Sequence, residues 1–258
     1  MRIPIVIFIN KLGKFLQNSP VFLLRSSQLK KVSKQSYNTT NSTEFWGHKN
    51  FVSQGFFPGE NEIFKLMNKK RGDLLLLGIG GGREAIVLGK AGFNITGVDF
   101  VKELVDKAVG NGINAGIEIK GINCDLADID FRPGSFDVIW YSCSIYSSIP
   151  GRKNRVKNLK KSAEILKPGG NVACFFYWNP IAGSGNLRWK LGKFFSWITF
   201  GNTTYERGDI YKDNLEFLHA FYNKKNLISE FDEAGFQVID FIFPENSNNA
   251  CALLKKRV

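Results

Sequence analysis

The hydrophobic pattern in the central part of the chain predicts alternating short strands and helices. Four consecutive leucines, 74–77, form an apolar run that is too short for a helix and typical of a strand buried on both faces of a parallel sheet. A glycine-rich turn follows at 78–82, and residues 83–90 then show the spacing of a helix. A second apolar run, 94–98, ends in Asp99. We therefore expect a unit of strand, turn, helix and strand.

The same alternation continues to the C-terminus. Strands are expected at 138–141 and 171–178, a helix at 226–234, and a closing hairpin made of 236–243 and 250–255. Strands that alternate with helices favour an α/β fold with a mostly parallel sheet.

The first 34 residues carry a separate amphipathic pattern. Apolar side chains recur there at helical spacing, with Lys11 and Lys14 off the stripe; the stripe consists of Ile5, Phe8, Ile9, Leu12, Phe15 and Leu16. Pro4 suits the first turn of such a helix, and the run Asn18-Ser19-Pro20 ends it.

Charge is distributed unevenly between this segment and the rest of the chain. Met1 to Thr43 contains seven Lys or Arg residues and no Asp or Glu, in a chain of 258 residues with a net charge of +12. A concentrated positive charge indicates a local anionic contact. We expect peripheral contact with an anionic membrane surface through residues 1–34. Docking of the segment on the main domain and an organelle-targeting role are the alternatives.

A second segment, 179–223, interrupts the pattern of strands and helices. It contains an apolar helical stripe surrounded by aromatic and basic side chains: Leu187, Arg188, Trp189, Lys190, Leu191, Lys193, Phe194, Phe195, Trp197, Ile198 and Phe200. This composition predicts a lid for an apolar or lipid-linked molecule, placed beside the N-terminal segment. A lid that only covers the core is the alternative.

The composition excludes several classes of protein. With 43% hydrophobic residues the chain has enough apolar surface to fold, and no apolar run reaches the ~18 residues that a membrane-spanning helix requires. The four cysteines are far apart and only two histidines accompany them, so we expect no metal site. Reduced, buried thiols in a cytoplasmic protein are the expected state.

The turn at 78–82 has the composition of a nucleotide-binding loop. Glycines let the backbone approach a bound molecule closely, and the N-terminus of the following helix points its amides toward that molecule. Asp99 at the end of the second strand can accept hydrogen bonds from a ribose diol. A dinucleotide fingerprint would need Gly or Ala where Arg83 stands, so NAD and FAD are disfavoured.

Five stretches, in their order and spacing, resemble class I S-adenosylmethionine-dependent methyltransferases. They are LLGIGGG (76–82), TGVDF (96–100), CDLADIDF (124–131), GSFDVI (134–139) and ILKPGG (165–170). The resemblance implies a doubly wound α/β fold with a mostly parallel seven-stranded sheet and an antiparallel last strand. The methyltransferase domain would occupy 46–258 with the lid insertion at 179–223, preceded by the basic, helical N-terminal segment 1–45.

The resemblance also implies which residues bind S-adenosylmethionine. Asp99 would hold the ribose hydroxyls, Asp125 would accept from the adenine amino group, and Ser142 would lie near the sulfonium. The full set is Gly78, Ile79, Gly80, Gly82, Asp99, Phe100, Asp125, Leu126 and Ser142. Leu76 stands where the family often has an acid that contacts the methionine ammonium. Backbone carbonyls, or another acid such as Glu84, would have to replace it.

The expected activity is methyl transfer to a small-molecule or lipid-linked acceptor. His219 and Tyr146 are the candidate general bases for an oxygen acceptor. Ser142-Cys143-Ser144-Ile145 stands after the fourth strand in place of an Asn/Asp-Pro-Pro-Tyr motif, so DNA base methylation is disfavoured and a nucleic-acid partner is not expected. RNA methylation and a non-catalytic binding protein on the same fold are the alternatives. The sequence indicates no oligomeric state.

Overall fold

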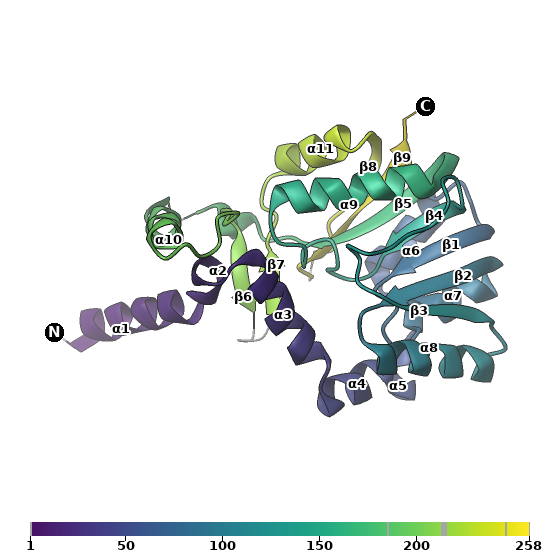
Figure 1. Ribbon diagram of the computed structural model, residues 1–258, viewed down its shortest axis with the longest axis horizontal. Helices are drawn as coiled ribbons and strands as arrows, with labels where there is room; N and C mark the ends of the chain where they lie inside the picture. The colour runs from purple at the N-terminus through teal and green to yellow at the C-terminus, as the bar shows by residue number, and fades with distance from the viewer. Residues whose placement is uncertain (1, 185, 213–215, 246, 258) are drawn as a thin grey trace.

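The computed structural model describes residues 2–184, 186–212, 216–245 and 247–257, and a seven-stranded sheet forms its centre (Figure 1). The strands are β1 (Gly72–Leu77), β2 (Phe93–Asp99), β3 (Ile119–Asn123), β4 (Phe136–Tyr141), β5 (Leu166–Tyr177), β8 (Phe236–Ile242) and β9 (Asn249–Lys256). Their order is β3-β2-β1-β4-β5-β9-β8, with β9 antiparallel to both neighbours and the other pairs parallel. The predicted fold class is confirmed.

The leucine run of β1 explains why helices cover both faces of the sheet. Leu75 and Leu77 pack in one apolar cluster with side chains of α9 and α11, whereas Leu74 and Leu76 pack in a second cluster with α6, α7 and α8. Successive side chains of a strand point to opposite faces, so a fully apolar strand needs a helical layer on each side. These helices are α6 (Pro58–Leu66), α7 (Arg83–Lys90), α8 (Lys102–Asn114), α9 (Arg152–Ile165) and α11 (Lys224–Glu233).

The N-terminal segment is helical, as the apolar stripe predicts, and most of it packs on the rest of the chain. It forms α1 (Arg2–Gln17), α2 (Pro20–Leu23), α3 (Ser26–Tyr37), α4 (Thr40–Gly47) and α5 (Lys49–Val52). Helices α4 and α5 pack against α8 and α7 of the sheet domain. Helix α1 differs from the others, because its apolar side chains from Ile3 to Leu12 are exposed.

The insertion after β5 contains a helix where the stripe predicts one and a hairpin that the sequence did not predict. Its elements are the 3₁₀ helix η1 (Pro180–Gly183), α10 (Asn186–Ile198), β6 (Asp209–Lys212) and β7 (Glu216–His219). A third apolar cluster joins the insertion to the N-terminal helices through Phe22, Leu29, Tyr205 and Phe217. We call residues 2–52 and 180–220, within the described part of the chain, the cap; Figure 1 shows α1, α2, α3, α10 and the hairpin together on one side of the molecule.

The insertion begins and ends at one place on the sheet domain. The amide of Asn179 donates to the carbonyl of Phe221 at 2.8 Å, and the amide of Phe221 donates to the carbonyl of Tyr177 at 2.9 Å. Backbone hydrogen bonds therefore close the base of the insertion next to the end of β5.

Candidate active site

A cavity of about 1130 Å³ lies where the carboxyl ends of β1, β2 and β4 meet the cap. Neighbours β1 and β4 lie at the point where the strand order reverses, and open α/β sheets bind ligands outside the carboxyl ends of strands at such a point. The cap supplies the opposite wall with side chains from α3, α4 and the β6–β7 hairpin. The sheet domain and the cap therefore both line the cavity.

The structure brings eight of the nine cofactor residues implied by the sequence to the walls of this cavity. These are Gly78, Ile79, Gly80, Asp99, Phe100, Asp125, Leu126 and Ser142. Gly82 is the exception: its φ is +94°, and a Cβ there would lie 3.2 Å from the Ala108 Cα of α8. Gly82 thus allows the turn and the close approach of α8, and its predicted contact with the cofactor remains a prediction.

Asp99 is held in place by the glycine-rich turn. Its Oδ2 accepts from the Gly80 amide at 3.0 Å, and its Oδ1 accepts from the Val101 amide at 3.0 Å. Burial raises the pKa of Asp99 above its ordinary value, although these backbone amides oppose the rise. Gly80 has φ +52°, and a Cβ there would meet nothing within 4 Å. The carboxylate and the open side of the turn form one concave surface at the end of β2.

Asp125 is paired with two lysines of the cap. The Nζ of Lys30 lies 2.5 Å from Oδ1, and Lys34 forms a second ion pair with Oδ2. Burial opposes ionisation of Asp125, but the Ala127 amide and the two lysines outweigh it and lower its pKa. The acid predicted to face adenine thus also anchors α3.

Glu84, in the first turn of α7, contributes a buried carboxylate to the cavity wall. Its Oε1 lies 2.8 Å from the Arg83 guanidinium, which also donates to both carboxylate oxygens of Glu60 at 2.6 and 2.7 Å. One guanidinium therefore pairs with two carboxylates, and one negative charge is in excess when both carboxylates are ionised. Burial raises the pKa of Glu84 to about 7, since Arg83 compensates this carboxylate only in part.

The cap adds an aromatic wall that the sequence analysis did not identify. Its cavity-lining aromatic residues are Tyr37, Phe45, Trp46 and Phe51, and Phe57, which lies just outside the cap, extends this wall. The end of α4 lies directly on the glycine-rich turn, because a Cβ at Gly81 would overlap the Trp46 carbonyl and lie 2.6 Å from the Gly47 Cα. In the sequence, this wall is indicated by the high density of aromatic residues between positions 45 and 57.

Neither of the two predicted bases, His219 and Tyr146, is among the described residues that line the cavity. Tyr146 is fully buried and its hydroxyl donates to Glu230 at 2.5 Å; burial and this carboxylate raise its pKa far above the ordinary value. Arg155 bridges Glu230 to Glu206 with bonds of 2.7 and 2.8 Å. This geometry disfavours a direct catalytic role for Tyr146 and assigns it to the buried contact between α9 and α11.

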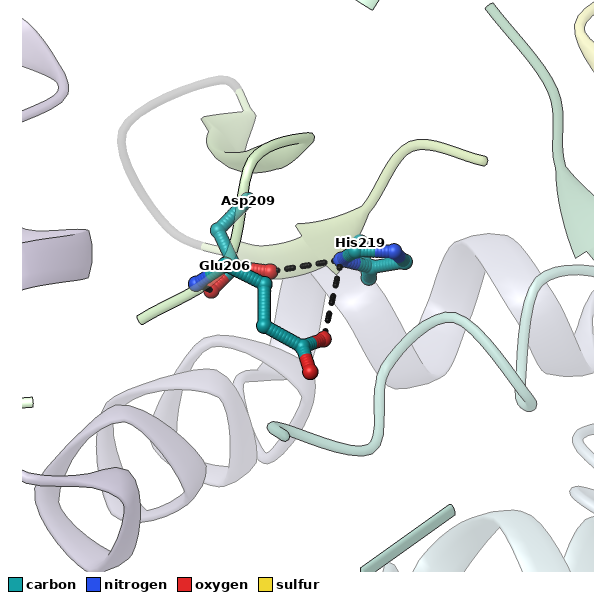
Figure 2. A group of neighbouring side chains, drawn as sticks. All are labelled: Glu206, Asp209 and His219. Carbon is teal, nitrogen blue, oxygen red and sulfur yellow. Dashed lines mark hydrogen bonds and ion pairs between the residues drawn. The ribbon is translucent and has the colours of Figure 1, made fainter. Parts of the chain in front are cut away.

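His219 lies in the same buried network, at the end of β7. Its Nδ1 is 2.7 Å from Asp209 Oδ1 and 3.6 Å from Glu206 Oε2. Figure 2 marks both contacts with dashed lines. Burial and nearby Arg155 lower the pKa of His219 to about 3, whereas burial raises that of Asp209 to about 7. A histidine with so low a pKa is a weak base, and this one lies behind the cavity wall.

These three side chains also have the composition of a metal site. The ligand atoms of Glu206, Asp209 and His219 lie within 4.8 Å of one another. Asp209 and His219 are already joined by a direct hydrogen bond, and Arg155 places a guanidinium on Glu206. In this geometry the group is a hydrogen-bonded anchor between the cap and α9, because a cation would have to displace Arg155.

Comparison with known sequences finds similarity in the central part of the chain. A family model described as "Methyltransferase domain" matches residues 75–174. The ubiquinone/menaquinone biosynthesis C-methyltransferase UbiE of Bdellovibrio bacteriovorus is 35% identical over 78 residues, which are 30% of this chain and 32% of that protein. The similarity thus spans about a third of the length of this curated relative.

Solved structures share the fold at low sequence identity. A SAM-dependent methyltransferase of Methanosarcina mazei has a TM-score of 0.58 at 19% identity, covering 79% of this chain and 99% of that one. The PH0226 protein of Pyrococcus horikoshii has a TM-score of 0.62 at 17% identity, with 86% and 99% covered. The CcbJ methyltransferase of Streptomyces caelestis gives 0.59 at 14%, with 84% and 96% covered.

Proposed function

We propose that the chain, whose residues 75–174 match a family model described as "Methyltransferase domain", binds S-adenosylmethionine in its central cavity and methylates a small, apolar or lipid-linked acceptor. The observation that carries the proposal is the convergence of the Gly78–Gly80 turn, Asp99 and Asp125 on a single cavity. These residues come from three different strand ends.

The chemistry of the cavity wall fits the parts of this cofactor. Asp99 would hold the ribose hydroxyls, because its carboxylate lies at the end of β2 beside the open side of Gly80. Glu84 would receive the methionine ammonium in place of an acid at position 76, where Leu76 is fully buried in the core. The excess negative charge beside Arg83 would be neutralised by that ammonium.

Methyl transfer would require little chemical catalysis by the chain's own side chains. When bound, S-adenosylmethionine supplies a methyl group already activated by its sulfonium, so the acceptor needs mainly to be aligned with it. The aromatic wall of the cavity, which includes Trp46 of the cap and the neighbouring Phe57, would exclude water and orient an apolar acceptor. The likeness to UbiE, a protein named for ubiquinone and menaquinone biosynthesis, supports an acceptor of this apolar kind.

Calorimetry with S-adenosylhomocysteine tests cofactor binding. We expect the intact chain to bind it, Asp99→Ala to abolish binding, and Asp130→Ala to leave it unchanged, since Asp130 is a carboxylate with 92% of its side chain exposed. Absence of binding by the intact chain would contradict the proposal and favour a non-catalytic scaffold.

Labelled methyl groups identify the acceptor class. Incubation of the protein with methyl-labelled S-adenosylmethionine and a cell extract should place the label in the solvent-extractable lipid fraction or in small apolar molecules. Label in RNA instead would show that the acceptor class is wrong while the cofactor assignment stands.

A further inference from the structure

The outer side of the cap exposes an unusual number of large apolar side chains. On α1, Ile3 is 74% exposed and Phe8 is 65% exposed; in and just after α10, Trp197 is 74% and Phe200 is 76% exposed. The other exposed large apolar side chains of the two helices are Ile5, Val6, Ile7, Ile9, Leu12, Leu16, Leu187, Leu191, Phe194 and Ile198. Apolar side chains gathered in this way indicate an interaction surface.

Helices α1 and α10 form this surface together although they are far apart in the sequence. The rings of Phe15 and Phe195 lie 6.3 Å apart, and Arg188 donates to the Lys14 carbonyl at 3.0 Å. Phe22 lies between them, 5.4 Å from Phe15 and 6.2 Å from Phe195. Figure 1 shows α1 extending from the side of the molecule that carries α10.

The charge around this surface is of one sign. No Asp or Glu occurs in 1–43 or in 179–205, the two stretches that contain α1 and α10. Exposed cations flank the apolar side chains on both helices: Lys11, Lys14, Arg188, Lys190 and Lys193. Two copies of the chain would bring like charges together at this surface, whereas the anionic headgroups of a membrane complement both its apolar and its basic character.

The length of α1 fixes how it would meet a bilayer. Its 16 residues span about 24 Å at 1.5 Å per residue, less than the ~30 Å of a hydrocarbon core. Among the described residues, no helix combines the length and the apolar character needed to cross a membrane. An amphipathic helix of this kind lies in the plane of the interface.

We propose that α1, α10 and Phe200 form a docking surface for an anionic lipid bilayer. This proposal does not depend on the proposed methyl transfer, because it is argued from the exposed apolar side chains and the positive charge of residues outside the cavity. The cap that carries it also supplies Lys30, Tyr37 and Leu218 to the cavity wall. Docking would therefore hold the cavity close to the leaflet.

Flotation of the full chain with vesicles tests the surface. We expect it to float with vesicles of phosphatidylcholine mixed with phosphatidylglycerol and to float much less with phosphatidylcholine alone. Ile5→Ser/Phe8→Ser/Trp197→Ser should remain in the bottom fraction. The matched control Ile113→Ser/Ile239→Ser, which removes exposed apolar side chains from the sheet domain, should float like the parent protein.

Two further measurements test the contribution of the basic residues to vesicle binding and the insertion of Trp197 into the bilayer. Lys11→Gln/Lys190→Gln should bind anionic vesicles about 25-fold more weakly, roughly fivefold for each lysine. Trp197 fluorescence should shift to shorter wavelength on vesicle addition, and Trp197→Phe should remove most of that shift. Equal flotation of the triple serine variant would overturn the proposal. The proposal would also be overturned if the parent protein did not bind vesicles but formed a concentration-dependent dimer, and if the triple serine variant did not form that dimer.

Discussion

The ammonium of Lys30 lies 2.5 Å from the carboxylate of Asp125, so the cap binds the same acid that is expected to face the adenine of the cofactor. Lys34, one turn further along α3, pairs with the other carboxylate oxygen. Closure of the cap and completion of the nucleoside site thus depend on one side chain at the end of β3.

Removing these two ion pairs should loosen the cap. Lys30 and Lys34 remain 42% and 38% exposed, so solvent screens each pair and the double substitution Lys30→Ala/Lys34→Ala should cost only about 1 kcal/mol. The open population should rise roughly fivefold, and chymotrypsin should cut faster at Tyr37 and Trp46. Lys31→Ala, an exposed lysine of the same helix, is the matched control. Equal cleavage of all three proteins would show that the pairs do not hold the cap.

Glu84→Gln should weaken binding of ligands that carry an ammonium group and spare those that lack it. The affinity for S-adenosylhomocysteine should fall about tenfold to a hundredfold, the range for loss of a charge-assisted hydrogen bond. The affinity for 5′-methylthioadenosine, which has no amino-acid part, should stay within about twofold, whereas Asp99→Ala should weaken both. Glu103→Gln on the exposed side of α8 serves as control. Equal losses for both ligands would contradict the role of Glu84.

Glu84 should also make stability depend on pH. Burial raises its pKa in the folded protein from 4.5 to about 7, so the folded state holds a proton on this group more tightly than the unfolded chain does. The resulting stabilisation is fully present below pH 4.5 and is lost as the pH rises through about 7. The free energy of unfolding of Glu84→Gln minus that of the parent should therefore grow between pH 5 and pH 8, by on the order of 2 kcal/mol. Urea denaturation of both proteins measures this difference, and a constant difference would refute it.

Tyr146→Phe should affect stability more than activity. The substitution leaves Glu230 without its 2.5 Å hydroxyl donor, which should cost about 1 to 2 kcal/mol, while Arg155 continues to pair with that carboxylate. Methyl transfer should stay within about threefold of the parent rate. A hundredfold fall in kcat with unchanged stability would instead restore Tyr146 as a catalytic base.

Local patterns predicted the sheet domain because each of its elements is specified by neighbouring residues. The leucines of β1 need two covering layers, and Gly78 and Gly80 adopt positive φ where the chain turns into α7. The helix predicted at 83–90 is α7 as observed. Strand-end acids such as Asp99 could be placed because parallel strands bring their carboxyl ends to one edge of the sheet.

The cap could be predicted only in part, because long-range contacts decide its arrangement. Helical spacing indicated α1 and α10, but not that Lys30 and Lys34 of α3 reach Asp125, some ninety residues later. His219 and Tyr146 were chosen for their residue types, and their burial with Asp209 and Glu230 depends on packing between distant segments. The hairpin β6–β7 is short, and no strong alternation marks it in the sequence.

The closed base of the insertion, where Asn179 and Phe221 are joined by a backbone hydrogen bond, makes the segment between them an interchangeable module. Its length and composition can change during evolution without altering the register of β5, because the two ends remain paired whatever lies between them. Its residues that line the cavity, Lys212, Glu216 and Leu218, can thus change while the strand ends that carry Asp99 and Asp125 are inherited unchanged.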